Sequence, residues 1–356
     1  MKLRNVLVLG LALGVTPACK KEVPPAPVAA ETKPAPPPEP ELPPAPALAP
    51  LPKGLPEMEV PTDVALTPEK VALGKQLFFD KRLSGNASKS CESCHQHDKA
   101  WTDGQVLSKK GNDQLNTRHS PSMYNIGFQP HWYWDGRSTN LEAQALAAWK
   151  GQVGGDPPKV SAFLMEIPAY RVQFLKVFGS PPTPETISAA LAAFMRTMNS
   201  GDSDWDKHEA GVEGAVSEDA IAGWKIFRDK AHCTLCHVPP LFTDFQFHNV
   251  GIGMDAKEPD VGRFKISNDV KDTGAFKTPA LRSVVRSAPY FHDGSVVKLE
   301  DAVKLMLAGG KGDRKKNKYL DAKLKKVTLT DKEFAQLMAF IESLDSTEAF
   351  ERPTLP

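Results

Sequence analysis

The clearest hydrophobic pattern in the chain is an apolar stripe at helical spacing near its C-terminal end. The stripe consists of Phe334, Leu337, Met338, Ile341 and Leu344, which fall on one face of an α-helix. Thr330 and Glu333 come before it and form a capping box, which starts such a helix. Further helix start signals stand at Thr67-Pro68, Thr183-Pro184 and Ser217. Strand alternation is scarce, so the pattern predicts a mainly α-helical fold.

A second apolar run, residues 6–15, is continuous and follows Lys2 and Arg4. It is too short to span a bilayer as a helix, but it fits the hydrophobic region of an export signal. The small residue before Cys19 resembles the cleavage box of bacterial lipoproteins. We therefore predict a signal peptide over residues 1–19 and a periplasmic protein held to a bacterial membrane by a lipid on Cys19. Ordinary signal cleavage is the alternative.

Composition sets the next segment, residues 20–60, apart from the rest of the chain. Fifteen of the 32 prolines lie between Pro24 and Pro61, and a segment so poor in large apolar residues is predicted to be a disordered linker. The remainder is long enough for two domains, which we place at residues 61–205 and 206–356. With 44 Lys+Arg against 43 Asp+Glu, the chain lacks the general positive charge of nucleic-acid binders.

The cysteines carry the strongest chemical signal. Apart from Cys19, all of them fall in two Cys-x-x-Cys-His motifs, Cys91-Glu-Ser-Cys94-His95 and Cys233-Thr-Leu-Cys236-His237. In this motif two thiols attach a haem c covalently and the His ligates its iron. A redox dithiol, a zinc site or disulfides would not require a His after each pair. The motifs predict two covalently bound haem c groups, with His95 and His237 as axial ligands.

The two motifs lie inside a longer internal repeat. Each is followed by a Pro and, 14 residues later, by the Asp of an aromatic-Asp-Gly segment, at Asp135 in the first copy and Asp293 in the second. In both copies a Leu-Glu pair begins 6 residues after that Asp. The repeat predicts two cytochrome-c-like haem domains related by internal duplication.

The sixth ligand of each iron decides what the haem can do. A methionine there favours electron transfer, whereas an open position lets a small molecule bind. Met306 lies 13 residues after Asp293 on a helical face, and Ala148 takes the corresponding place in the first copy. We therefore predict an electron-transfer haem in the C-terminal domain and an accessible haem in the N-terminal domain, with Met254 and Met338 as rivals to Met306.

Over residues 63–345 the sequence resembles the bacterial dihaem cytochrome c peroxidases and their MauG-type relatives. The resemblance rests on both haem motifs, the Met306 helix, Tyr133-Trp-Asp-Gly-Arg137, Gly262-Arg-Phe-Lys265 and Ala288-Pro-Tyr-Phe-His292. It implies that electrons from a small donor protein enter at the C-terminal haem and pass to the N-terminal haem, where hydrogen peroxide is reduced to water. It also implies that Met306 is an axial ligand and that Trp134 is a catalytic relay between the haems.

Three positions depart from the family pattern. Gln152 stands where the family usually places a Glu that moves a proton during peroxide cleavage, and an amide has no titratable proton. Gly111 lies in the loop where many members carry a removable distal His, so the N-terminal haem is expected to be open. His119 replaces a calcium-binding Asn, which puts a calcium site in doubt, although Ser287 and Pro289 match its other side.

The leading hypothesis is a peroxidase that takes electrons from a small c-type cytochrome or a cupredoxin, with Trp134 and Gln152 as its candidate catalytic residues. A MauG-like enzyme that oxidises Trp or Tyr of a partner protein is the second hypothesis, and the missing Glu supports it. A non-enzymatic dihaem electron carrier is the third. The resemblance also implies a homodimer, for which no sequence signature was found.

Overall fold

The computed structural model describes residues 39–346 and 348–356, together with residues 7, 10 and 14. Cys19 with the rest of the predicted signal peptide, and the first part of the predicted linker, lie outside these residues. The end of the linker belongs to the folded body: the Lys53 carbonyl accepts a hydrogen bond from the Asp202 N–H (2.9 Å), and the Gly54 carbonyl accepts one from Arg282 (2.9 Å). These two hydrogen bonds show that the folded part begins before residue 61. A Pro-rich segment can make such bonds because its backbone carbonyls are still available as acceptors.

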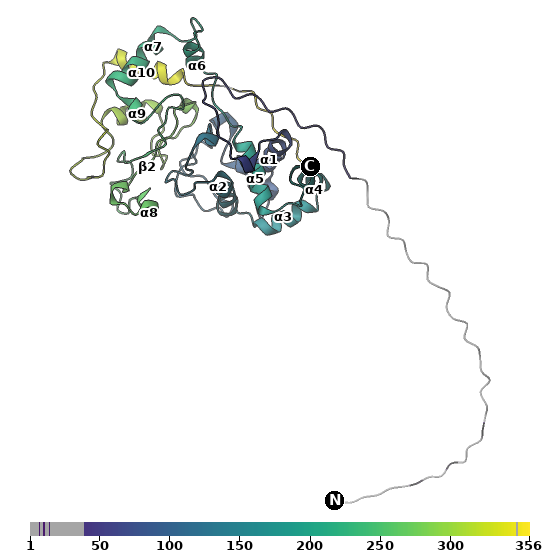
Figure 1. Ribbon diagram of the computed structural model, residues 1–356. Coiled ribbons are helices and arrows are strands. Elements are labelled where there is room, and N and C mark those ends of the chain that lie inside the picture. The colour runs from purple at the N-terminus through teal and green to yellow at the C-terminus, as the bar shows by residue number, and fades with distance from the viewer. Residues whose placement is uncertain (1–6, 8–9, 11–13, 15–38, 347) are drawn as a thin grey trace, which may run out of the picture. The chain divides into compact units, whose positions relative to one another are not determined.

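The fold is mainly α-helical, as predicted (Figure 1). Its helices are α1 (Pro68–Phe79), α2 (Leu141–Ala148), α3 (Pro157–Met165), α4 (Pro168–Phe178), α5 (Pro184–Met195), α6 (Asp204–Glu209), α7 (Glu218–Lys225), α8 (Phe264–Ser267), α9 (Leu299–Leu307) and α10 (Asp331–Glu342). Two short strands, β1 (Phe247–His248) and β2 (Phe276–Lys277), pair antiparallel. None of the helices in the described part of the chain has the length and apolar character needed to cross a membrane.

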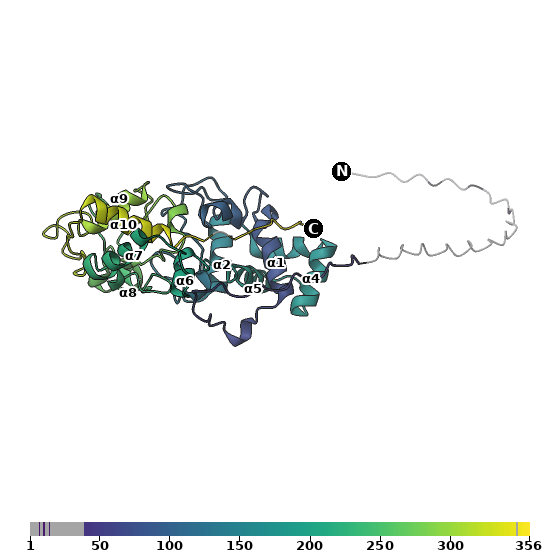
Figure 2. The same cartoon turned by 90° about the horizontal axis from the view of Figure 1, so that it is seen from above.

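Two separate hydrophobic clusters hold the folded body together. One gathers buried residues between Leu73 and Met198, and the other gathers residues between Trp205 and Leu344. Figure 2 shows α1, α2, α4 and α5 on one side and α7 to α10 on the other. Trp205, which we placed at the end of the first domain, packs in the second cluster.

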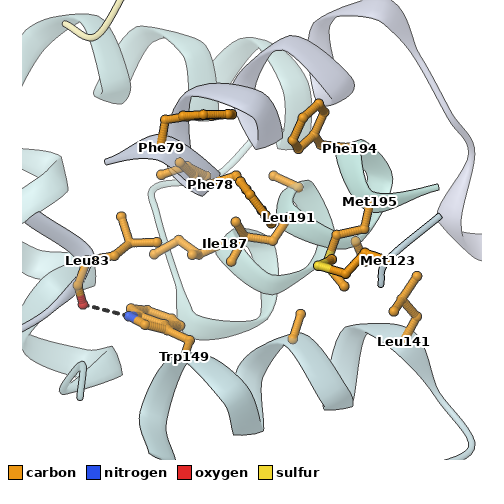
Figure 3. Packing of buried hydrophobic residues seen from close by; sticks show 14 of the residues in the cluster. Phe78, Phe79, Leu83, Met123, Leu141, Trp149, Ile187, Leu191, Phe194 and Met195 are labelled. Carbon is orange, nitrogen blue, oxygen red and sulfur yellow. Dashed lines mark hydrogen bonds between the residues drawn. The ribbon is translucent and has the colours of Figure 1, made fainter. Parts of the chain in front are cut away.

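Helix pairs α1/α5 and α7/α10 form equivalent centres of the two clusters. Gly74 of α1 lies against the Ala190 carbonyl of α5, and Gly223 of α7 lies against the Gln336 carbonyl of α10. A Cβ atom at either glycine would overlap that carbonyl oxygen, so only glycine permits this approach. Phe78, Ile187 and Leu191 fill the first cluster, as Figure 3 shows. The two halves of the sequence repeat therefore share the same helix packing as well as the same spacing.

The helix starts follow the predicted capping residues. The Thr67 side chain accepts from the Lys70 N–H, Thr183 from Thr186, Ser217 from Ala220, and Thr330 forms its capping box with Glu333. These are local interactions within one turn of helix, which explains why the sequence alone reveals them.

Residues 348–356, which we call the C-terminal strap, return from the second cluster to the first. The Phe350 ring stacks on His97 (centroids 4.6 Å apart) and on Phe79 (5.5 Å), and meets the edge of Trp101. Arg82 donates to the carbonyl of Pro356 (2.8 Å). Both views show the C-terminus beside α1 and α4 (Figures 1 and 2).

Candidate functional site

The first Cys-x-x-Cys-His motif presents its histidine in a form that can bind a metal. Cys91–Ser93 form a 3₁₀ turn, and His95 follows it with its Nδ1–H donated to the Trp101 carbonyl (2.7 Å). Burial lowers the pKa of His95, so the imidazole is neutral. Because Nδ1 is occupied, Nε2 is the nitrogen left to ligate iron.

The second motif repeats this geometry. Cys233–Leu235 form a 3₁₀ turn, and His237 donates its Nδ1–H to the Phe242 carbonyl (3.0 Å). Burial lowers the pKa of His237 as well. Trp101 and Phe242, which supply the carbonyls, both have positive φ (60° and 54°). The two sites are thus built alike, down to the backbone conformation that supports each histidine.

Each motif opens into its own cavity. Cys91, Cys94 and His95 line a cavity of about 430 Å³, and Cys233, Cys236 and His237 line one of about 220 Å³. Burial raises the pKa of Cys91 and of Cys233 to about 12, so neither is the low-pKa thiolate of a redox dithiol. The four cysteines form no disulfide in the described part of the chain.

A zinc site gains no support from the geometry. Among the described residues, one group of three metal-ligating side chains comes together, Cys236, Asp244 and His248. His248 also donates to Asp321 (2.5 Å), and although burial lowers its pKa, its hydrogen bonds to Cys236, Asp321 and Asp244 raise the pKa to about 9. A protonated imidazole is not a metal ligand.

Met306 of α9 lines the C-terminal cavity together with His237. Its rivals Met254 and Met338 are not among the residues that line it. Ala148, at the end of α2, lines the N-terminal cavity with His95. Met306 and Ala148 thus line different cavities, each together with the histidine of its own motif.

Two methionines that sequence reasoning missed also line the N-terminal cavity. Met123 and Met195 are 4% and 5% exposed and belong to the first hydrophobic cluster (Figure 3). Met123 corresponds to Leu281 in the second copy, since each lies two residues after the repeated Pro. The sequence analysis did not reveal either methionine because it compared the copies only at the position of Met306.

Gln152 lies on a π-helical turn, Trp149–Val153, that continues α2, and it is one of the residues that line the N-terminal cavity. Its carbonyl accepts a hydrogen bond from the Gly111 N–H (2.8 Å). A Cβ atom at Gly111 would overlap the Val153 carbonyl, so this loop has no room for a distal histidine at that position.

Asp135 is the one carboxyl group among the residues that line the N-terminal cavity in the described part of the chain. It forms ion pairs with Arg118 (2.7 Å) and Arg137 (3.0 Å) and is 4% exposed. Both oxygens of its carboxyl group accept hydrogen bonds from these guanidinium groups, so Asp135 is engaged by the protein and does not replace the proton-moving Glu.

His119 lines the same cavity, but its ring is engaged by the protein. Its Nδ1–H donates to the Gln105 carbonyl (2.8 Å), and burial lowers its pKa. Its own carbonyl accepts the indole N–H of Trp134 (2.8 Å). Calcium requires oxygen ligands, so the residue present does not fit the expected calcium site, even though Ser287 and Pro289 lie on the same cavity.

The two cavities share a wall. It contains Trp134, Lys277, Thr278, Pro279, Val284, Tyr290 and Phe291. Trp134 therefore lies between the two haem-binding motifs, where the sequence analysis placed it. Lys277 was not anticipated, because its neighbours come from distant parts of the chain.

The buried ammonium group of Lys277 bears on whether the cavities fit haem groups. Its side chain is buried, and its ammonium group has the amide oxygen of Gln129 as its hydrogen-bond partner. Burial lowers the pKa of Lys277 to about 7 because no carboxylate of the described chain offsets the charge. Haem carries two propionate carboxylates, which this ammonium could pair. With two thiols and a free imidazole nitrogen in each cavity, the residues present fit two covalent haem c groups.

Comparison with known proteins defines the class. A family model described as di-haem cytochrome c peroxidase matches residues 68–214. The chain is 35% identical over 337 residues to the cytochrome-c peroxidase IdrP1 of Denitromonas iodatirespirans, covering 85% of this chain and 89% of that protein. It is 36% identical over 292 residues to the methylamine utilization protein MauG of Methylophilus methylotrophus, covering 80% and 85%.

A solved structure agrees with these sequence matches. The crystal structure of a MauG-like protein associated with microbial copper homeostasis superimposes with a TM-score of 0.76 at 32% identity, covering 83% of this chain and 94% of that one. The chain belongs to the di-haem cytochrome c peroxidase family. Membership confirms the prediction of a peroxidase-class enzyme and implies two haem c groups.

Proposed function

We propose that the protein reduces hydrogen peroxide to two molecules of water at the N-terminal cavity. The reaction consumes two electrons and two protons, and a small redox protein supplies the electrons at the C-terminal cavity. The observation that carries this proposal is the difference between the cavities: Met306 lines one, whereas the other presents Ala148 and excludes a side chain at Gly111. The N-terminal cavity is also the larger, at about 430 against 220 Å³.

The residues that would hold the cofactors are Cys91, Cys94 and His95 on the N-terminal side and Cys233, Cys236, His237 and Met306 on the C-terminal side. A haem c supplies an iron atom that binds peroxide where its sixth position is open and exchanges single electrons where a methionine fills that position.

The side chains around the N-terminal cavity orient peroxide without supplying its protons. The Gln152 amide can donate to one peroxide oxygen and accept from the other, but it has no acidic proton. The Asp135 carboxyl group is already paired with Arg118 and Arg137. The two protons therefore come from water, and Trp134 in the shared wall is the aromatic group between the two sites.

Electron balance tests the proposal. The haem-loaded full chain would be mixed with peroxide and either a reduced small c-type cytochrome or a reduced cupredoxin. We expect two donor molecules to be oxidised for each peroxide consumed, because peroxide reduction needs two electrons. Peroxide consumption without donor oxidation would overturn the proposal, and so would no peroxide consumption at all.

A second candidate function is oxidation of Trp or Tyr in a partner protein. The absence of a proton-moving acid beside Gln152 favours it, and relatives named MauG share the fold. To test it, N-acetyl-tryptophanamide would be added as a probe together with peroxide. We then expect peroxide to be consumed, oxidised probe to be detected by mass spectrometry, and little of the donor protein to be oxidised. A pure electron carrier would neither consume peroxide nor bind cyanide.

We further propose that the protein acts outside the cytoplasm, tethered through a lipid on Cys19. The apolar run that precedes Cys19 and the covalent haem motifs support this location. Radiolabelled palmitate should enter the wild-type protein and not the Cys19→Ser variant, and the variant should appear in the soluble periplasmic fraction. A homodimer also stays a prediction, to be tested by its mass in solution.

A further inference from the structure

One short segment concentrates positive charge in an otherwise balanced chain. Residues 311–326 contain eight Lys or Arg and two Asp, a net charge of +6, whereas the whole chain carries +1. We call this segment the basic loop. It joins α9 to α10 and lies on the side of the C-terminal half that faces away from α1 to α5 (Figures 1 and 2).

Most of these charges are not used to hold the protein together. Lys311 pairs with Asp255 (3.3 Å), and Lys323 lies 3.8 Å from Asp244. Five further lysines are exposed and form no ion pair with any described residue: Lys315, Lys316, Lys318, Lys325 and Lys326. Like charges that lie close together repel one another and destabilise the free protein. The same charges attract an anionic partner, so binding of that partner relieves the repulsion.

The backbone beneath these lysines is firmly held. Arg314 donates to the carbonyls of Leu320 and Asp321 (3.1 and 2.8 Å) and to that of Leu324. The Asp321 N–H donates to the Asn249 carbonyl (2.9 Å), and the Val327 N–H donates to the Leu307 carbonyl (2.8 Å). The basic loop therefore presents its charges on a fixed surface rather than on a free tail.

This surface adjoins the C-terminal haem-binding motif. Lys323 donates to the carbonyl of Leu235, inside Cys-Thr-Leu-Cys-His (3.1 Å), and Lys323 and Lys325 line the C-terminal cavity. Leu235 and Val238 are 51% and 43% exposed. Two exposed apolar side chains at the motif thus stand beside a rim of lysines, the arrangement of a short-lived docking site with an apolar centre and a charged rim.

We propose that the basic loop, with Leu235 and Val238, is the docking surface for the electron donor, and that this donor is a small redox protein with an acidic face. This inference rests on the proposed function, because it names the partner of the C-terminal site. An acidic protein is favoured over an anionic membrane because Lys323 contacts the haem-binding motif and, with Lys325, lines the cavity at which electrons would enter. Electrostatic attraction of this kind raises association rates about 10- to 1,000-fold at low salt.

The test compares charge-reversed variants of the haem-loaded full chain. The test variant is K315E/K316E/K326E, whose three lysines do not line the C-terminal cavity, and the control, with exposed lysines in the N-terminal half, is K81E/K159E/K176E. Rates would be measured with an acidic and a basic cytochrome c of similar potential, at low and high salt. A small neutral reductant measures peroxide turnover without docking.

We expect the test variant to lose at least about tenfold in the second-order rate with the acidic cytochrome at low salt. The control variant should keep the wild-type rate, and the rate with the small reductant should not change. Turnover with the small reductant but equal rates for all variants would overturn this inference and leave the proposed function standing. No peroxide turnover with any reductant would overturn the proposed function itself.

Vesicles containing phosphatidylglycerol provide the remaining comparison. If the test variant loses binding to these vesicles but keeps the wild-type rate with the acidic cytochrome, the basic loop faces a membrane and the inference is wrong. Faster reaction of the wild type with the basic cytochrome than with the acidic one would contradict it equally.

Discussion

Gln152 determines how a proton can move in the N-terminal cavity. Because Gln152 is one of the residues that line the cavity, and two arginines hold the cavity's carboxyl group, we expect Gln152→Glu to supply the missing acid. General acid–base catalysis contributes about 100- to 10,000-fold in favourable cases. We therefore expect kcat/KM for peroxide to rise at least about tenfold, measured by stopped-flow with a reduced donor.

The matched control for this substitution is Gln152→Met, which keeps the length of the side chain and removes its hydrogen bonds. It should lower kcat/KM, since peroxide loses its orienting partner. Equal kcat/KM in wild type, Gln152→Glu and Gln152→Met would show that this side chain does not touch the substrate.

Lys277 is the charged residue in the wall that the two cavities share. A buried ammonium favours the less positive, reduced form of a nearby iron, so Lys277→Gln should lower the reduction potential of at least one haem. The expected shift is about 60 mV, a tenfold change in a one-electron equilibrium. Spectroscopic redox titration at pH 6, where Lys277 is charged, measures it, and unchanged potentials would contradict the assignment.

At the scale of elements, the two glycine contacts set the spacing of each helix pair. Gly74→Ala and Gly223→Ala each force a Cβ against a backbone carbonyl, and overpacking of this kind typically costs about 1–3 kcal/mol in the free energy of unfolding. Gly151→Ala is the control, because a Cβ there meets nothing within 4 Å. Guanidinium unfolding of the haem-loaded protein would measure the losses, and variants as stable as the control would contradict the packing.

The C-terminal strap carries a pH-sensitive carboxyl group. Burial raises the pKa of Glu348 from 4.5 to about 7, against the opposing pull of Arg286 and Lys75, and His97 lies 3.8 Å away. A raised carboxyl pKa means that the docked strap favours the protonated acid, so its docking should weaken as pH rises through 7. Hydrogen exchange of residues 348–356 should therefore be faster at pH 8 than at pH 6.

The Glu348→Gln variant isolates this carboxyl group. Its amide cannot ionise, so the difference in exchange between pH 6 and pH 8, after correction for intrinsic rates, should disappear. A variant that keeps the wild-type difference would show that another group controls the strap.

Helix starts could be predicted from the sequence, but the strap could not. Thr330 and Glu333 interact within one turn, so their pattern is visible in four consecutive residues. Phe350 meets Phe79 and Trp101, which lie more than 240 residues away in the chain, and no local pattern announces that contact. Its consequence reaches the site, because the Trp101 carbonyl holds the His95 ring.

At the scale of the whole molecule, the duplication could be predicted from the sequence because the spacing between the repeated residues is the same in both copies. The contrast between Met306 and Ala148 could be predicted for the same reason. The shared wall was not readable, because Trp134 and Lys277 meet only when the two halves pack together. The reason why Gly111 carries no side chain also needed the fold, since the Val153 carbonyl that excludes a Cβ belongs to the distant π-helical turn after α2.

Electron paramagnetic resonance of the oxidised, haem-loaded protein tests the central claim, that one site is closed by Met306 and the other is open. We expect one low-spin signal with His/Met ligation and one high-spin signal in the wild type. Met306→Ala should abolish the low-spin signal alone, and Met338→Leu should leave both unchanged. Two low-spin signals in the wild type, or a spectrum that Met306→Ala does not alter, would contradict the assignment of the two sites.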